Sequence, residues 1–226
     1  MAPRHGEGGD CRIGFVDARP VLAAAVVTAL VGMMDLADAA PAGFDQQLQA
    51  KLHYCLTCHG PSGRGFRGFY PIPRLAGQQT EYLENQLHAF TEHRRTNNIM
   101  FNVGHVLSPA MVAALAANFH DLDPKPLGGA PKDLAAAGKK IFEEGIASGN
   151  VPPCASCHGP DGKGNGPFPR LAGQLSDYVS SKLTNWDKER GQDPKNPDNS
   201  AIMEPIAHGL NEAQIKAVAA YVSYLE

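Results

Sequence analysis

The hexapeptide Cys55-Leu56-Thr57-Cys58-His59-Gly60 is the stretch that determines the fold of this chain. About a hundred residues later it recurs as Cys154-Ala155-Ser156-Cys157-His158-Gly159. The sequence downstream of each copy recurs as well, because Pro-Arg-Leu-Ala-Gly-Gln ends once at Gln78 and again at Gln174. A motif that returns together with its flanking sequence indicates two copies of one structural unit.

Two cysteines separated by two residues and followed by a histidine form the pattern of covalent haem attachment. Each thiol adds to one vinyl group of the porphyrin, and the adjacent histidine is placed to bind the iron as proximal ligand. The sequence therefore predicts two covalently bound c-type haems. The predicted attachment residues are Cys55, Cys58, Cys154 and Cys157. The predicted proximal ligands are His59 and His158.

Three other chemistries share this cysteine spacing: half of a four-cysteine zinc site, a thioredoxin-like redox pair and a structural disulfide. A single zinc ion would require both pairs to converge, yet each pair has its own histidine and its own flanking repeat. A redox pair is expected in a strand-rich setting, and no strand-like alternation surrounds either copy. These alternatives are therefore disfavoured.

The sixth ligand of each iron is predicted from the few methionines that follow the first motif. Met100, Met111 and Met203 are the methionines there, and Met100 and Met203 occupy equivalent positions of the repeat. Met111 is matched by Gln214, so we interpret it as a surface or packing residue. A loop methionine opposite a proximal histidine closes the iron to other ligands and raises its reduction potential. Met100 and Met203 are the predicted axial ligands.

A second repeated pair leaves bis-histidine ligation open as an alternative. His105 and His208 each lie five residues after the methionine of their unit. A repeated histidine beside an apolar segment is more often a packing or hydrogen-bonding residue than a ligand, so methionine is favoured. The other histidines that follow residue 40 have no counterpart in the second unit and receive no role; they are His53, His88, His93 and His120.

Apolar residues at helical spacing predict α-helices around both motifs. In the first unit the helices are expected before Cys55 and at residues 82–90 and 111–122. In the second unit the expected helices cover residues 134–144, 178–186 and 212–225. Glycine and proline make the segments that follow each motif irregular, so they are expected to wrap the haems as loops. The predicted fold class is all-α.

Two groups of residues near the haems have both a structural and a haem-related interpretation. The repeated Pro73 and Pro169 form simple turns, or they present a carbonyl oxygen that holds the proximal imidazole. Tyr82, Tyr178 and Trp186 pack on apolar helix faces, or they donate hydrogen bonds to haem propionates. The sequence leaves both choices open, although packing is the commoner role of such aromatic residues.

Residues 1–39 have the features of an export signal. A segment with three arginines precedes an apolar run from Val21 to Val31, and Ala37-Asp38-Ala39 is a suitable cleavage site. The run is short for a membrane span, and cleavage would remove Cys11, which lies outside both motifs. The alternative is an uncleaved membrane anchor. Export predicts a periplasmic location, which agrees with covalent haem attachment.

The rest of the chain divides into two units of similar size. Residues 40–122 are the first predicted domain, residues 123–131 a short linker rich in proline and glycine, and residues 132–226 the second domain. Domains this small have small apolar cores, which a buried haem would enlarge. The chain has 226 residues and a formal net charge of −3, so nothing indicates a nucleic-acid partner.

These features resemble the dihaem cytochrome c4 family. The similarity covers nearly all of the chain after residue 39, including both haem motifs, the sequence Pro-Arg-Leu-Ala-Gly-Gln and an alanine-rich final helix in each unit. The resemblance implies two tandem class I cytochrome c domains related by a pseudo-twofold axis, with the haem propionate edges facing each other. It also implies that His59 pairs with Met100 and His158 with Met203 at the two irons.

The resemblance implies an electron carrier and not an enzyme. Members of the family are periplasmic, often membrane-associated, and carry electrons from a cytochrome bc complex or a dehydrogenase towards terminal oxidases. We therefore expect a periplasmic electron shuttle with peripheral membrane association. One alternative is a dihaem subunit of a dehydrogenase complex, either a flavoprotein that oxidises sulfide or a quinoprotein that oxidises alcohols. A peroxidase or sensor is disfavoured, because it needs an iron with an open position.

The two units differ in the polar segment that precedes each methionine. Glu92–Asn98 in the first unit is shorter than Asp187–Ala201 in the second, which contains the insertion Gly191–Ser200. The two haem environments are therefore expected to differ in exposure and in reduction potential.

Overall fold

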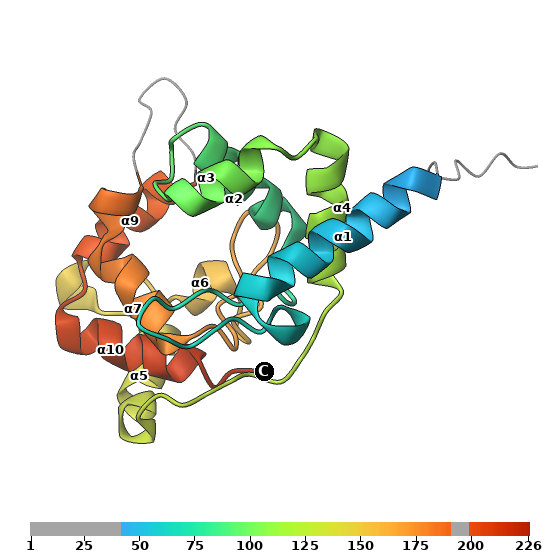
Figure 1. Cartoon of the computed structure of the whole chain (residues 1–226). Helices are drawn as coiled ribbons and strands as arrows, with labels where there is room; N and C mark the ends of the chain where they lie inside the picture. The colour runs from blue at the N-terminus through green and yellow to red at the C-terminus, as the bar shows by residue number, and fades with distance from the viewer. Residues whose placement is uncertain (1–41, 191–198) are drawn as a thin grey trace, which may run out of the picture. The chain divides into compact units, whose positions relative to one another are not determined.

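The computed structural model describes residues 42–190 and 199–226, so the predicted export signal and most of the insertion at 191–200 lie outside the described residues. The first half contains α1 (Ala42–His59), η1 (Pro61–Gly63), α2 (Thr80–Thr91), α3 (Asn98–His105) and α4 (Pro109–His120) (Figure 1). The second half contains α5 (Lys132–Glu144), η2 (Ala147–Gly149), α6 (Ala155–His158), α7 (Ser176–Thr184), α8 (Trp186–Glu189), α9 (Ser200–His208) and α10 (Glu212–Val222). Within this part of the chain the β-type pairing is limited to isolated bridges, so the predicted all-α class is confirmed.

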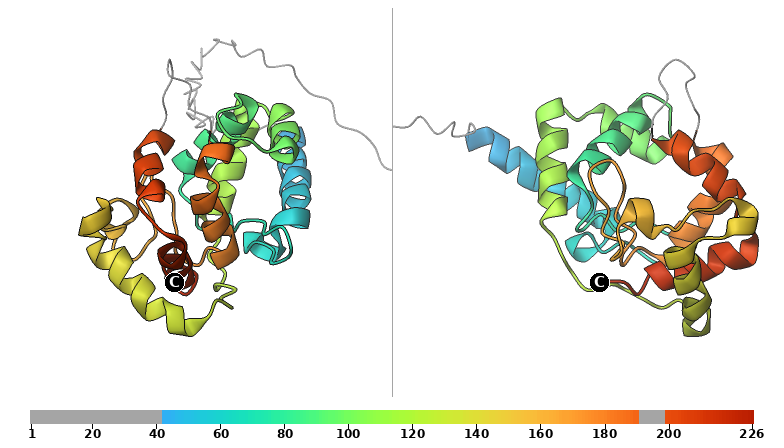
Figure 2. Two further views of the ribbon diagram at one scale, coloured as in Figure 1. Left: turned by 90° about the vertical axis from the view of Figure 1, so that its left-hand side faces the viewer. Right: turned by 180° about the vertical axis from the view of Figure 1, so that it is seen from behind.

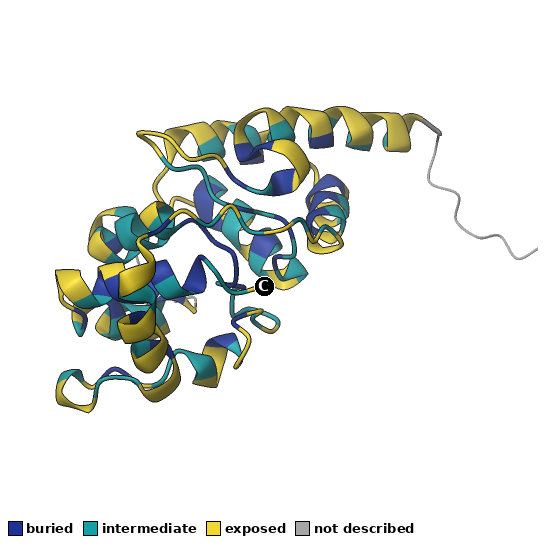
Figure 3. Ribbon diagram, turned by 90° about the horizontal axis from the view of Figure 1, so that it is seen from below, coloured by how far each residue is buried: buried dark blue, intermediate teal, exposed yellow. Residues whose placement is uncertain are grey.

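Helices α1, α2 and α4 build the core of the first half. Leu52 of α1, Leu83 of α2 and Leu115 of α4 belong to one buried cluster. The same cluster contains Met111, which confirms that this methionine is a packing residue. Helix α1 is exposed along one side and partly buried along the other, as the long helix in Figure 3 shows. This is the pattern expected of an amphipathic helix on a small core.

Helices α5 and α10 form the corresponding core of the second half and lie side by side in Figure 2. Phe142 of α5 is fully buried and packs in one cluster with Val218 and Val222 of α10. A Cβ atom at Gly138 would lie 2.0 Å from the carbonyl oxygen of Ala217. Only glycine therefore allows the two helix backbones to approach so closely.

The structure corrects the expectation that the axial methionines lie on loops. Met100 is in α3 and Met203 is in α9. Helix α3 starts where it does because the side chain of Asn97 accepts a hydrogen bond from the Met100 N–H at 3.0 Å. The single helix predicted at residues 178–186 is also corrected, because a break at Asn185 divides this segment into α7 and α8.

The two halves are joined by two glutamines that occupy equivalent positions of the repeat. Gln174 accepts a hydrogen bond from the Arg74 N–H at 2.8 Å and donates one to the Arg74 carbonyl at 3.0 Å. Gln78 accepts from the Arg170 N–H at 2.7 Å and donates to the Arg170 carbonyl at 3.0 Å. All four residues are buried. The exchange is reciprocal, as expected for two domains related by a pseudo-twofold axis.

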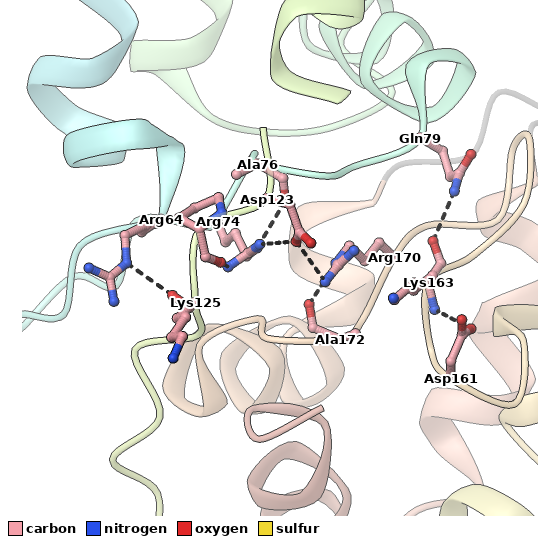
Figure 4. A network of polar contacts seen from close by, with 11 residues as sticks. Arg64, Arg74, Ala76, Gln79, Asp123, Lys125, Asp161, Lys163, Arg170 and Ala172 are labelled. Carbon is pink, nitrogen blue, oxygen red and sulfur yellow. Dashed lines mark hydrogen bonds and ion pairs between the residues drawn. The ribbon is translucent and has the colours of Figure 1, made fainter. Parts of the chain in front are cut away.

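The side chains of the same two arginines converge on the linker. Asp123 Oδ1 lies 3.4 Å from Arg74 Nη2 and 3.5 Å from Arg170 Nη2 (Figure 4). Arg74 also donates to the carbonyl of Pro124, and Arg64 donates to the carbonyl of Lys125. Burial and the neighbouring Arg170 lower the pKa of Arg74 to about 10, so the guanidinium is still charged at neutral pH. The linker is therefore held in place by both halves.

Replacing Gln174 with leucine should destabilise the protein by about 1–3 kcal/mol, because the buried N–H and C=O of Arg74 lose their partners. The free energy of urea unfolding measures the loss. Gln79→Leu is the matched control, since the Gln79 side chain makes its bond to the Lys163 carbonyl at the surface (Figure 4). The control should change stability by no more than about 0.5 kcal/mol. Equal losses in the two variants would contradict the importance of the buried pairs.

Candidate functional site

One cavity of about 940 Å³ is lined by every residue for which the sequence predicts a role in haem attachment or iron binding. These residues are Cys55, Cys58, His59, Met100, Cys154, Cys157, His158 and Met203. Both halves of the chain contribute to the lining, which is mainly apolar and includes Leu83, Phe90, Leu183 and Val218. The fold thus brings each predicted methionine into the same cavity as the histidine of its unit. Ligation itself stays a prediction.

Both predicted proximal histidines are oriented by a proline carbonyl. His59 Nδ1 lies 2.9 Å from the carbonyl oxygen of Pro73, and His158 Nδ1 lies 2.9 Å from that of Pro169. A carbonyl oxygen only accepts, so Nδ1 carries the proton and the Nε2 lone pair is left for a metal. Burial lowers the pKa of both histidines, and the bond to the carbonyl opposes this only in part. The sequence hypothesis that these prolines hold the imidazoles is confirmed.

A tight turn after each motif returns the chain to the histidine. The Gly65 N–H donates to the carbonyl of His59 at 2.7 Å, and the Gly164 N–H donates to that of His158 at 2.8 Å. Gly60 has a φ of 77°, and a Cβ atom there would lie 2.4 Å from the Gly65 carbonyl oxygen. The glycine directly after the histidine is therefore part of what places the proline loop over the imidazole.

The cysteines suit thioethers better than thiolates. The four cysteines of the described chain are free of disulfides. Burial raises the pKa of Cys55 and raises that of Cys154 to about 11. A zinc ligand or a redox nucleophile requires a stabilised thiolate. The raised pKa of Cys55 and Cys154 therefore disfavours the zinc site and the thioredoxin-like redox pair.

His105 and His208, the alternative candidates for the sixth ligands, do not line the cavity. His105 is exposed and stacks on Phe101, with 5.6 Å between the ring centroids. His208 is exposed, and its Nε2 lies 2.8 Å from Asp187 Oδ1. Met100 and Met203 both line the cavity. This placement favours methionine over bis-histidine ligation at each iron.

A polar cluster lies where the two halves share the cavity. The Nη1 atoms of Arg95 and Arg190 both donate to Gln86 Oε1, at 2.6 and 2.7 Å. Arg95 Nη2 donates to the Tyr178 hydroxyl at 2.6 Å, and Arg190 Nη2 lies 3.5 Å from the Tyr82 hydroxyl. Each arginine thus reaches a tyrosine of the opposite half. The sequence alone did not predict a role for these arginines, although each follows the tyrosine of its own half at a similar distance along the chain.

The charges and donors of the cavity fit haem propionates. Its cationic lining residues are Arg74, Arg94, Arg95, Arg170, Lys182 and Arg190, whereas Glu189 is the one carboxylate among the described lining residues. Trp186 Nε1 and Arg190 Nε are buried and have no hydrogen-bond partner among the described residues. Arg74 and Arg170 lie beside Asp123, Lys182 pairs with Glu189, and Arg94 pairs with Glu92. Arg95 and Arg190 bond to neutral side chains, so they are the buried cations that an added anion would suit. Buried donors likewise require acceptors. Two haems would supply both through their propionates, so the residues present fit the predicted cofactors.

Comparison with known proteins agrees with this geometry. The Cytochrome c family model matches residues 46–124 and 135–226. The chain is 36% identical over 194 residues to cytochrome c4 of Thiocapsa roseopersicina, covering 84% of this chain and 96% of that protein. The chain belongs to the cytochrome c4 family. A solved structure of Acidithiobacillus ferrooxidans cytochrome c4 superposes with a TM-score of 0.65 at 39% identity, covering 76% of this chain and 98% of that one.

Membership of the family confirms the resemblance found in the sequence. This protein therefore has two tandem cytochrome c domains and two covalently bound c-type haems. It is an electron carrier and not an enzyme, as are the cytochrome c4 proteins it resembles. It is also 34% identical over 213 residues to a protein of Thiomonas intermedia named thiosulfate dehydrogenase electron acceptor, with 92% of each chain covered.

Proposed function

We propose that the protein is a periplasmic electron shuttle in which His59 and Met100 bind one iron and His158 and Met203 bind the other. The strongest support is the cavity, whose lining contains both methionines and both proline-bonded histidines but neither His105 nor His208. When bound, each haem supplies one-electron chemistry as its iron alternates between the ferrous and ferric states. The proposed donor is a cytochrome bc complex or a dehydrogenase, and the proposed acceptor a terminal oxidase.

The side chains around each proposed site orient the imidazole and make most of the lining apolar. The hydrogen bond from Nδ1 to the proline carbonyl fixes the plane of the imidazole and strengthens Nε2 as a donor. The apolar lining disfavours the additional positive charge of ferric iron and so favours a high potential. No ligand has to enter or leave in this arrangement. Two sites in one cavity allow an electron to enter through one half and leave through the other.

Export through residues 1–39 and work at the membrane surface are part of the proposal. The support is the basic and apolar sequence of the leader and the small-residue site at Ala37-Asp38-Ala39. In residues 42–190 and 199–226, no single helix has the length and hydropathy to cross a bilayer. Helices α3 and α4, bent by 117° relative to each other, meet that criterion of length and composition only when taken together.

The mass and spectrum of the purified ferric protein test these assignments together. We expect the mass of residues 40–226 plus two haems, and a weak absorption band at the red edge of the spectrum from sulfur bound to ferric iron. A mass that retains the leader would replace cleavage by an uncleaved anchor. A low-spin spectrum without the sulfur band would contradict methionine ligation and restore the bis-histidine alternative.

Replacing Met203 with alanine should lower the reduction potential of one haem by on the order of 0.1 V, because axial ligands control the potential strongly. The other haem should keep its potential. A spectroelectrochemical titration measures both values, and carbon monoxide should bind the altered haem after reduction. Met111→Leu is the control, since Met111 packs in the core of the first half and leucine has a similar volume. Unchanged potentials in Met203→Ala would contradict its role as ligand.

A second candidate function is acceptance of electrons from a thiosulfate dehydrogenase. The support is the similarity over 92% of the chain to the Thiomonas intermedia electron acceptor. We expect the ferric protein to be reduced rapidly when thiosulfate and the thiosulfate dehydrogenase of that organism are added together. Absorbance of the reduced haems follows the reaction, and omission of the enzyme is the control. Equal rates with and without enzyme would exclude this donor but leave the shuttle function intact.

A further inference from the structure

The side chain of Gln86 is the point at which one buried arginine from each half meets the other. Gln86 lies in α2 and Arg95 follows that helix, whereas Arg190 follows α8 of the second half. Only 8% of Arg95 and 9% of Arg190 are exposed. One oxygen atom, Gln86 Oε1, accepts a hydrogen bond from both guanidinium groups. The position of each arginine therefore depends on the same amide.

The backbone beside this amide is also shared between the halves. The Thr96 N–H, one residue after Arg95, donates to the carbonyl of Glu189 at 2.8 Å, one residue before Arg190. The two segments that hold the arginines are thus in direct contact. A displacement of one segment is transmitted to the other without passing through the core of either half.

The two halves of the repeat differ at the position of Gln86. Tyr82 and Tyr178 are equivalent, and the residue four positions later is Gln86 in the first half but Lys182 in the second. Lys182 does not hold an arginine: it pairs with Glu189 and lies 5.2 Å from the centre of the Tyr178 ring. Gln86 therefore bonds to the guanidinium groups of both arginines, whereas its equivalent in the second half, Lys182, bonds to neither.

We propose that Gln86 is a positioning residue that holds Arg95 and Arg190 against the haem propionates of both halves, so that a single side chain sets the reduction potentials of both haems. The inference rests on the proposed dihaem function. A guanidinium beside a propionate places positive charge near the haem. This charge destabilises the ferric state relative to the ferrous state and so raises the reduction potential. The effect is stronger in a buried site, where little water screens the charge. Both arginines change position or charge environment when their common acceptor changes.

The variant Gln86→Glu tests this proposal, because it keeps the size of the side chain and the accepting oxygen but adds a negative charge. A negative charge between the arginines stabilises the ferric state, so both potentials should fall in a spectroelectrochemical titration. The matched control is Gln47→Glu, which makes the same substitution in α1, where the side chain is exposed and does not line the cavity. Solvent screens that charge, so the control should shift both potentials much less.

A shift of only one potential in Gln86→Glu, or a shift no larger than in the control, would overturn the proposal. If Gln86→Glu fails to bind two haems, Gln86→Met removes the accepting oxygen without adding charge. Both potentials should then move away from their wild-type values, whereas a purely structural role would lower the unfolding temperature and leave both potentials unchanged. The sulfur band of the ferric spectrum distinguishes a failure of the proposed axial ligands from a failure of the proposed role of Gln86. Its absence from the wild-type protein contradicts the proposed ligands, while an intact band with one shifted potential contradicts only the role of Gln86.

Discussion

The hydrogen bond from each motif histidine to a proline carbonyl is the interaction on which the site depends. It fixes the proton on Nδ1, leaves the Nε2 lone pair free for a metal and connects the haem motif to the loop that follows it. A glycine with positive φ turns the chain directly after each histidine and so helps the proline loop return to it. The loop that follows then continues to Gln78 or Gln174, so the same segment that orients the imidazole also joins the two halves.

The interface between the halves contains several buried polar and charged side chains. Buried glutamines bond to the backbone of the arginines in the opposite half, and the buried Arg95 and Arg190 meet at the neutral amide of Gln86. Such a cluster is costly without anions, because removal of a charge from water requires compensation. Two haems with four propionates provide that compensation. The covalent cofactors are therefore expected to contribute to the stability of the interface as well as to electron transfer.

Duplication has produced two similar sites with different surroundings. Helix α1 runs without interruption through the first motif, whereas a loop separates α5 from α6 in the second half. Gln86 bridges two arginines, whereas its counterpart Lys182 pairs with Glu189. These differences give each half its own electrostatic environment while the histidine, proline and glycine geometry stays the same. Different potentials at the two haems, which the sequence predicts, would favour directional transfer of an electron.

The sequence by itself determined the repeat, the all-α class, the family and the set of haem-binding candidates, because these depend on local spacing that occurs twice. It also singled out Pro73 and Pro169, although it left their role open. Only the tertiary structure decided that Met100 and Met203 lie in helices and line the cavity. His105 and His208 end the same two helices but do not line the cavity. The arginine cluster around Gln86 was likewise absent from the sequence prediction. Its contacts join residues about a hundred positions apart, and periodicity within one segment carries no information about which distant side chains meet.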